Sequence, residues 1–257
     1  MASACFRFKQ FTVWHEGCAM KVGTDGVLLG AWCPVEAMGD RRLAMGYRVS
    51  GIGEEAMQVL DVGTGSGLIA LMLAQRIENA QITAIDIDSG AVEQAKYNFD
   101  ISPWADRLAC HQTALQEVEG ESIYDLIVSN PPYFQDSLKN PNSQRAMARH
   151  TDTLPYKELL QHSARLLKEK GTLALVLPIE AEQPIIALAQ TYGLYPTHIT
   201  HVYPKPGKAA KRLLIALQAS PHPLTEGKGE IRGELTLESE TAPRSEEYKE
   251  LTREFYL

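Results

Sequence analysis

From residue 58 onward, short aliphatic and β-branched runs alternate with stretches in which apolar residues recur every three or four positions. The short runs are typical of buried strands and the longer stretches of amphipathic helices. Strands are predicted at 58–62, 82–86, 108–111, 124–129, 172–177, 199–203 and 213–217. Helices are predicted at 67–78, 89–99, 159–167 and 185–190. This alternation predicts an α/β fold with a mostly parallel seven-stranded sheet and helices on both faces.

The two ends of the chain do not follow this alternation. Residues 8–13 could form a strand, and 24–31 a short helix capped by Thr24 or Asp25. We therefore expect an N-terminal lid or extension over residues 1–50, a main domain over 51–218, and a tail over 219–257. The tail has a weak strand pattern at 230–237. It ends in an amphipathic turn that we expect to dock on the body through three apolar residues, Tyr248, Leu251 and Phe255.

Composition narrows the class of protein. The chain has 257 residues, 44% of them apolar and 22% charged. Its longest apolar run, 173–177, is far short of the roughly 20 residues that cross a bilayer, so we expect no membrane span. Arg7 and Lys9 fall where a signal peptide would need an unbroken apolar block, so we expect no secretion. The four cysteines form no C-x-x-C pair. We expect a cytoplasmic protein with reduced thiols and no metal site.

Charge is unevenly distributed along the chain. The net charge is −7, yet residues 131–215 carry 11 basic and 6 acidic side chains. Such a segment is either a solvated surface or a local face for phosphates, because attraction acts within about a Debye length. The basic candidates are Lys139, Arg145, Arg149, Lys205, Lys208, Lys211 and Arg212.

A glycine-rich turn follows the strand at 58–62. Residues 61–67 read Asp-Val-Gly-Thr-Gly-Ser-Gly, and glycines at a strand-to-helix turn let a ligand approach the backbone. A dinucleotide fingerprint requires Gly or Ala where this chain has Leu68. Asp86 ends the next strand, where an acid can accept both hydroxyls of a ribose. Turn and acid together indicate an adenosine-containing ligand, with a dinucleotide still possible.

Residues 130–133, Asn-Pro-Pro-Tyr, follow the strand at 124–129. A structural turn could use the two prolines but does not require the flanking Asn and Tyr. Chance occurrence of this string is improbable at the composition of the chain, so residues 130–133 are a candidate functional motif.

With these motifs, residues 58–217 resemble the class I methyltransferases, Rossmann-like enzymes that use S-adenosyl-L-methionine and methylate planar exocyclic nitrogens. The resemblance implies that the glycine turn meets the methionine part of the cofactor, Asp86 the ribose, and the 130–133 turn the target amine. The cofactor residues it implies are Asp61, Gly63, Gly65 and Asp86, and the catalytic residues are Asn130, Pro131 and Tyr133. Residues 111–114 lack the acid that many such enzymes place near the cofactor adenine.

The N-terminal stretches 8–11 and 20–32, together with 145–150, 211–214 and the Phe-Tyr-Leu ending, are more narrowly similar to the tRNA1(Val) (adenine-37)-N6-methyltransferase family. That family implies methylation of adenine N6 in tRNA and an N-terminal segment that packs over the cofactor. We therefore add three cofactor candidates, Lys21, Thr24 and Asp25. The expected RNA contacts are Arg145, Arg149, His150, Lys205 and Lys208, and we expect a monomer.

Other functions remain open at this point. A protein glutamine N5-methyltransferase could use the same amine-holding turn. A guanine-N2 methyltransferase of ribosomal RNA more often has Phe where Tyr133 stands. A nicotinamide-dependent oxidoreductase is disfavoured by Leu68, and a noncatalytic RNA-binding module would not depend on Asn130.

Overall fold

The computed structural model describes residues 4–18, 21–35, 56–132, 154–222 and 230–257. Its centre is one eight-stranded sheet in the order β10-β8-β9-β7-β6-β3-β4-β5. The strands are β3 (Met57–Val62), β4 (Ala80–Asp86), β5 (Leu108–Gln112), β6 (Tyr124–Ser129), β7 (Leu167–Pro178), β8 (Leu194–Tyr203), β9 (Arg212–Ala219) and β10 (Ile231–Thr236). The class predicted from the sequence is confirmed, with one strand more than predicted.

The central strands run parallel, and only β9 is antiparallel to its neighbours. Strands β7 and β8 therefore end at the same edge of the sheet as β3, β4 and β6, and β9 begins there. In parallel α/β sheets this carboxyl edge is where ligands bind, since the loops that leave the strands meet there.

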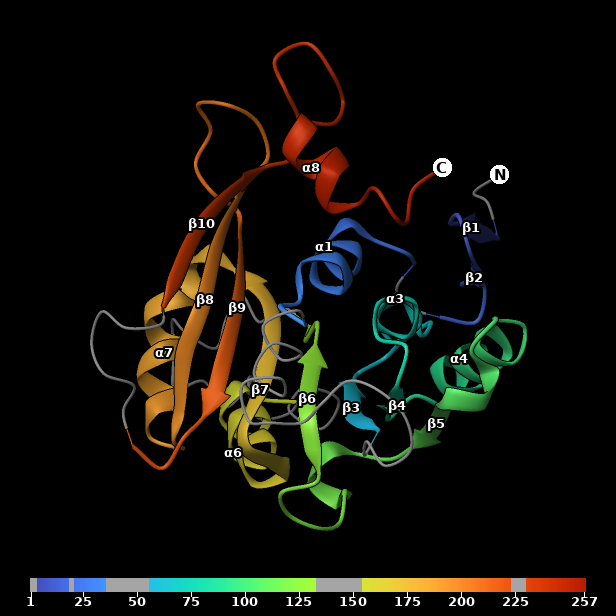
Figure 1. The fold of residues 1–257 in the computed structure, drawn as a ribbon, viewed down its shortest axis with the longest axis vertical. Helices are drawn as coiled ribbons and strands as arrows, with labels where there is room; N and C mark the ends of the chain where they lie inside the picture. Colours follow the sequence, from blue (N-terminus) through green and yellow to red (C-terminus); the bar gives the residue numbers. More distant parts are fainter. Residues whose placement is uncertain (1–3, 19–20, 36–55, 133–153, 223–229) are drawn as a thin grey trace, which may run out of the picture.

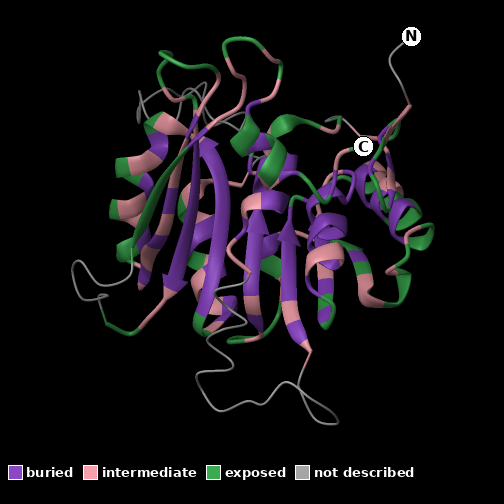
Figure 2. Cartoon of the chain, turned by 45° about the horizontal axis from the view of Figure 1, so that its top comes forward, coloured by how far each residue is buried: buried purple, intermediate pink, exposed green. Residues whose placement is uncertain are grey.

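Helices cover both faces of the sheet (Figure 1). One face carries α1 (Thr24–Trp32), α3 (Leu68–Arg76) and α4 (Ser89–Asp100), and the other carries α6 (Tyr156–Leu166) and α7 (Glu182–Gln190). Alternate strand residues face opposite cores, so Val59 packs with the first set of helices and Leu60 with the second. Figure 2 shows the result as buried central strands and exposed outer helix surfaces. Short 3₁₀ turns, η1 (Ala105–Arg107), η2 (Leu115–Glu117) and η3 (Ile179–Ala181), complete the connections.

The N-terminal residues form a hairpin rather than the single strand predicted at 8–13. Strand β1 (Cys5–Arg7) pairs with β2 (Thr12–Trp14), and the turn between them begins at Phe8. The ring of Phe8 stacks on Phe11 with centroids 4.6 Å apart and on Tyr256 at 5.9 Å. Aromatic packing between the two ends of the chain therefore decides where the turn lies, because Phe8 and Phe11 are both buried.

One helix cap differs from the prediction. Gly23 occupies the N-cap of α1, with no side-chain cap from Thr24 or Asp25. In α4 the N-cap is Asp88, and its side chain accepts a hydrogen bond from the Ala91 amide.

The C-terminal residues supply the eighth strand and a last helix. Strand β10 pairs in parallel with β8, so the weak pattern at 230–237 does form a strand. Helix α8 (Glu246–Leu251) follows, and Tyr248 and Phe255 are buried in the same core as α1 and α3. The domain boundaries at 50 and 218 stay a prediction, although β10 makes the last segment part of the main sheet.

Candidate active site

The glycine turn and the Asn-Pro-Pro turn lie side by side. Strands β3 and β6 are neighbours, and the register pairs Val62 with Ser129, the last residue of each strand. The Ser129 hydroxyl donates a 2.8 Å hydrogen bond to the Val62 carbonyl and ties the two strand ends together. Gly63 follows Val62 in sequence and Asn130 follows Ser129, so the chain leaves the sheet at the same point in both places. The parallel pairing of β3 with β6 therefore brings the two turns together.

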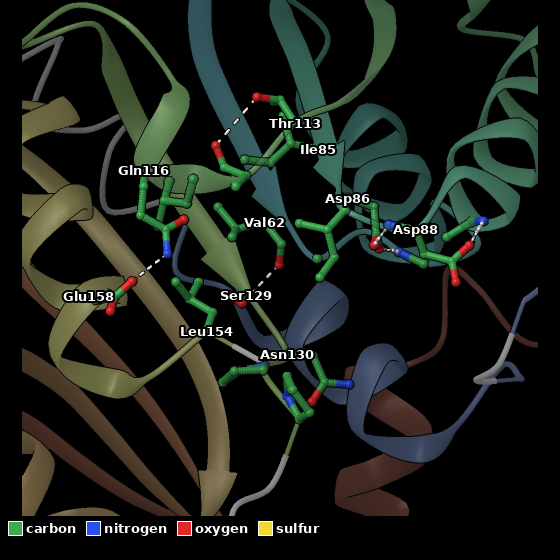
Figure 3. Close-up of a pocket in the computed structure, with 18 of the residues that line it drawn as sticks. Val62, Ile85, Asp86, Asp88, Thr113, Gln116, Ser129, Asn130, Leu154 and Glu158 are labelled. Atoms are coloured by element: carbon green, nitrogen blue, oxygen red, sulfur yellow. Dashed lines mark hydrogen bonds between the residues drawn. The ribbon is translucent and has the colours of Figure 1, made fainter. Parts of the chain in front are cut away.

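A cavity of about 370 Å³ opens at this point of the carboxyl edge (Figure 3). Its volume is within the range of small-molecule sites in proteins. Five of the predicted site residues line it: Gly63, Gly65, Asp86, Asn130 and Pro131. Apolar side chains, among them those of the strand residues Val62 and Ile85, form much of its wall. An amphipathic ligand with a flat apolar part fits such a lining.

The glycines of the turn have different physical roles. Gly63 and Gly65 have φ of +70° and +55°, and a Cβ added to either would meet nothing within 4 Å. Their bare backbone therefore faces the open cavity, where a ligand can approach. Gly67 has φ of +80°, and a Cβ there would lie 2.5 Å from the ring of Phe99. Its small size is needed for packing α3 against α4, not for the ligand.

Asp86 fixes the shape of the turn. One of its carboxylate oxygens accepts a 2.9 Å hydrogen bond from the Gly65 amide, and the other accepts a 3.0 Å bond from the Asp88 amide. Each oxygen has a second lone pair, so the half-buried carboxylate can still accept bonds from a ligand hydroxyl. The residue thus links the end of β4 to the glycine turn and also faces the cavity.

Asp61 lies under the turn and not in the cavity wall. It is fully buried, and one carboxylate oxygen accepts a 2.6 Å hydrogen bond from the Thr64 hydroxyl. Burial raises the pKa of Asp61 to about 7, against the lowering effect of bonds from Thr64 and the Ala70 amide. Asp61 therefore supports the turn from behind through the side chain of Thr64.

The segment after the N-terminal hairpin is fastened to α4 and reaches the cavity. The buried Asn98 amide group donates to the Trp14 and Ser66 carbonyls, both at 2.8 Å, and its oxygen accepts from the Trp14 amide at 2.9 Å. Cys18, four residues further on, lines the cavity. Burial, then Asp86 and Asp88, raise the pKa of this thiol to about 11, so it stays neutral at physiological pH.

Three N-terminal candidates, Lys21, Thr24 and Asp25, are not among the described residues that line the cavity. Lys21 and Thr24 are exposed, and Asp25 accepts two bonds from the Arg212 Nε, at 3.0 and 3.1 Å. Arg212 begins β9, so this ion pair places the start of α1 at the carboxyl edge. Their role as cofactor contacts stays a prediction.

The RNA-contact candidates divide into two groups. Lys205 and Lys208 are exposed in the loop from β8 to β9, at the carboxyl edge, and Lys205 pairs with Glu238 at 2.9 Å. Tyr133 and the other candidates, Arg145, Arg149 and His150, lie outside the described residues.

Several lining residues were not found from the sequence. Ile87, next to Asp86, is 53% exposed although apolar. Thr113 and Gln116 come from the segment after β5, and Glu158 comes from the first turn of α6. An acidic residue in the first turn of a helix is ordinarily explained by helix capping. The sequence therefore gives no signal that Glu158 lines a cavity.

Comparison with known proteins identifies the family. A family described as the methyltransferase small domain matches residues 49–197. The tRNA1(Val) (adenine(37)-N6)-methyltransferase of Parabacteroides distasonis is 49% identical, with 100% of this chain and 99% of that protein aligned. The chain belongs to this methyltransferase family. The Flavobacterium johnsoniae enzyme of the same name is 42% identical, over 98% of this chain and 99% of its own length.

Solved structures agree in fold. A predicted O-methyltransferase from Agrobacterium tumefaciens superposes with a TM-score of 0.64 at 16% identity, covering 90% of this chain and 96% of the other. A putative class I S-adenosylmethionine-dependent methyltransferase from Listeria monocytogenes gives 0.53 at 14% identity, with coverage of 78% and 64%. At these identities the likeness concerns the fold alone.

This family member is a methyltransferase. The cavity fits its cofactor, S-adenosyl-L-methionine, because open glycine backbone, a carboxylate that can accept hydrogen bonds from ribose hydroxyls and apolar walls meet in one space. Among the described residues no cluster of side chains suits a metal ion, and no helix is long and apolar enough to cross a membrane.

Proposed function

We propose that this methyltransferase modifies the N6 amine of an adenine in tRNA, namely adenine-37 of a valine tRNA. The two relatives that align with nearly the whole chain are named for this activity. The observation that supports the proposal is the pairing of Val62 with Ser129, since it puts the Asn-Pro-Pro turn, which we assign to the amine, beside the glycine turn, which we assign to the cofactor. We further propose a cytoplasmic monomer.

The residues of the second turn suit an aromatic amine. The lone pair of adenine N6 is delocalised into the ring, so the nitrogen is a poor nucleophile. The Asn130 side-chain oxygen and the Pro131 carbonyl would accept its two hydrogens and favour a pyramidal nitrogen. Pro131 has no amide N–H that could compete for the acceptor. We assign Asn130 and Pro131 to the amine, and Tyr133 to stacking on the base.

The cofactor, when bound, supplies a methyl group on a sulfonium sulfur. The chain's part is to align the amine with that methyl, and the gain comes from orientation of the two groups. Gly63, Gly65 and Asp86 would hold the cofactor, with Asp61 supporting the turn from below. No side-chain nucleophile is needed for a direct transfer.

Basic side chains at the carboxyl edge would meet the RNA backbone. Lys205 and Lys208 project from the loop between β8 and β9 on this edge, and the exposed pair of Lys205 with Glu238 is worth at most about 1 kcal/mol. A phosphate can therefore replace Glu238 at little cost. We assign Arg145, Arg149 and His150, which follow the amine-holding turn in sequence, to the same role.

The test uses unmodified valine tRNA, the same tRNA with guanine at position 37, and a release factor as a protein substrate. We expect N6-methyladenosine by nucleoside mass spectrometry in the first tRNA only. Asn130→Ala should lower turnover about 10²- to 10³-fold, as for loss of one preorganised polar group in other active sites. Binding of S-adenosylhomocysteine should stay within about twofold, because Asn130 is assigned to the amine.

The matched control is Asn79→Ala, since Asn79 is exposed beside the start of β4, away from the cavity. We expect it to retain full turnover. Methyl transfer to the release factor alone would refute the proposal, and so would an Asn130→Ala variant with unchanged turnover.

A further inference from the structure

The acids that line the cavity are unevenly placed. Among the described residues three carboxylates line it: Asp86, Asp88 and Glu158. The first two lie together at the end of β4, while Glu158 lies at the opposite end, beside Gln116 (Figure 3). A ligand that spans the cavity therefore meets hydrogen-bond acceptors at both ends.

Helix capping does not explain the position of Glu158. It is the third residue of α6, from which a Glu side chain often reaches back to the N-cap amide. Here the N-cap is Pro155, which has no N–H, and the helix has no side-chain cap. The Glu158 Oε2 instead accepts a hydrogen bond from the Gln116 Nε2, across the gap between α6 and η2. This bond holds the carboxylate at the cavity wall.

Apolar side chains line the cavity between its two acidic ends, where Figure 3 shows Val62 and Leu154. Ile87, 53% exposed, stands directly after Asp86, and Leu115 precedes Gln116. Leu154 contributes from the start of the α6 segment. A flat base attached to a ribose at Asp86 would be covered by these side chains, with its polar edge directed toward η2 and α6.

The segment after β5 has no acid of its own in the cavity wall. Its lining residues are Thr113, Ala114, Leu115 and Gln116. The Thr113 hydroxyl makes two long hydrogen bonds, to the Glu117 carboxylate at 3.3 Å and to the Ala114 carbonyl at 3.4 Å. The amino group at the edge of an adenine is a hydrogen-bond donor, and its bond to a carboxylate would be about twice as strong as its bond to a neutral oxygen.

We propose that Glu158, oriented by Gln116, accepts a hydrogen bond from the 6-amino group of the cofactor's adenine. Adenine specificity is then supplied by a helix on the far side of the cavity and not by the strand that precedes η2. Glu158 is a specificity residue, and Gln116 is a positioning residue that acts through it. The proposal rests on the family's cofactor and not on the RNA substrate.

The test compares two ligands with the wild type and with variants of the protein, in the absence of RNA. Calorimetry measures the Kd of S-adenosylhomocysteine and of its analogue with purine in place of adenine, which lacks the 6-amino group but keeps N1. For the wild type we expect the analogue to bind about tenfold more weakly, as for loss of one charge-assisted hydrogen bond. For Glu158→Ala we expect the two ligands to bind within about twofold of each other. Gln116→Ala should give an intermediate ratio.

Two further variants keep the test decisive. Glu169→Ala removes an exposed acid near the start of β7, outside the cavity lining, and should retain the tenfold ratio. If Glu158→Ala does not fold by circular dichroism, Glu158→Gln, which keeps the side-chain size, should lower the ratio at least about threefold. An unchanged ratio in the folded Glu158 variant would overturn the proposal, as would transfer of the effect to Thr113→Val. Neither result depends on which RNA is methylated.

Discussion

Replacing the turn glycines by alanine should separate cofactor binding from folding. Gly63 and Gly67 both have left-handed φ, +70° and +80°, which costs an alanine about 1–2 kcal/mol. At Gly63 a methyl group meets no protein atom within 4 Å, so no further cost arises. At Gly67 it would lie 2.5 Å from the Phe99 ring, and overpacking adds about 1–3 kcal/mol. We therefore expect the free energy of unfolding to fall by about 2–5 kcal/mol in Gly67→Ala and by about 1–2 kcal/mol in Gly63→Ala.

Ligand binding should show the reverse order. The Gly63 methyl group projects into the cavity, so Gly63→Ala should weaken S-adenosylhomocysteine at least about tenfold, a cost of about 1.4 kcal/mol. Gly67→Ala should bind within about threefold of wild type at temperatures where it is folded. In melting temperature we expect losses of about 2–8 °C for Gly63→Ala and about 4–20 °C for Gly67→Ala.

The assays are thermal melting by circular dichroism and calorimetry with S-adenosylhomocysteine. Gly207→Ala is the matched control, because Gly207 has φ of +69° and open space around it but does not line the cavity. It should lose about 1–2 kcal/mol and bind normally. Equal binding by Gly63→Ala and Gly207→Ala would refute the assignment of the glycine turn to the cofactor.

Two more substitutions test the support beneath the site. Because the folded pKa of Asp61 is raised to about 7, well above its unfolded value, the folded state binds the extra proton and Asp61 lowers stability as pH rises from about 4 to 7. We measure the free energy of unfolding in urea at pH 5.5 and at pH 8. Its decrease from pH 5.5 to pH 8 should be smaller in Asp61→Asn than in the wild type. An equal decrease would contradict the burial argument. Asn98→Ala removes three bonds that join Trp14 and Ser66, so we expect a loss of about 2–4 kcal/mol, checked by the same unfolding assay. Hydrogen exchange at residues 13–15 should accelerate, and unchanged protection there would show that other contacts hold the hairpin.

The central sheet could be predicted because its signals are local. Strands such as β3 and β6 are continuous aliphatic runs, and the glycines at 63–67 and the prolines at 131 and 132 mark where the chain must turn. The eighth strand was not counted, since β10 is largely exposed and its pattern of alternation is weak. Its place beside β8 is decided by pairing with a distant segment.

The hairpin at the N-terminus shows the same limit. A single strand at 8–13 fits the local pattern, but Phe8 and Phe11 stack within a cluster that includes Tyr256, almost 250 residues away. Packing of that cluster places the turn where the sequence pattern predicts an extended chain. Similarly, Asp88 caps α4 because its backbone is extended at the end of β4, a choice between neighbours that the sequence leaves open.

The sequence by itself determined the local features of the site: a glycine turn, an acid one strand later and an Asn-Pro-Pro turn, each readable because residue type alone fixes backbone freedom and hydrogen-bonding capacity. Only the tertiary structure decided which side chains share the cavity. Parallel pairing of β3 with β6 brings Gly63 beside Asn130, and packing of α6 against η2 brings Glu158 to Gln116. These contacts join residues 42 and 67 positions apart, over which local sequence carries no information about distance.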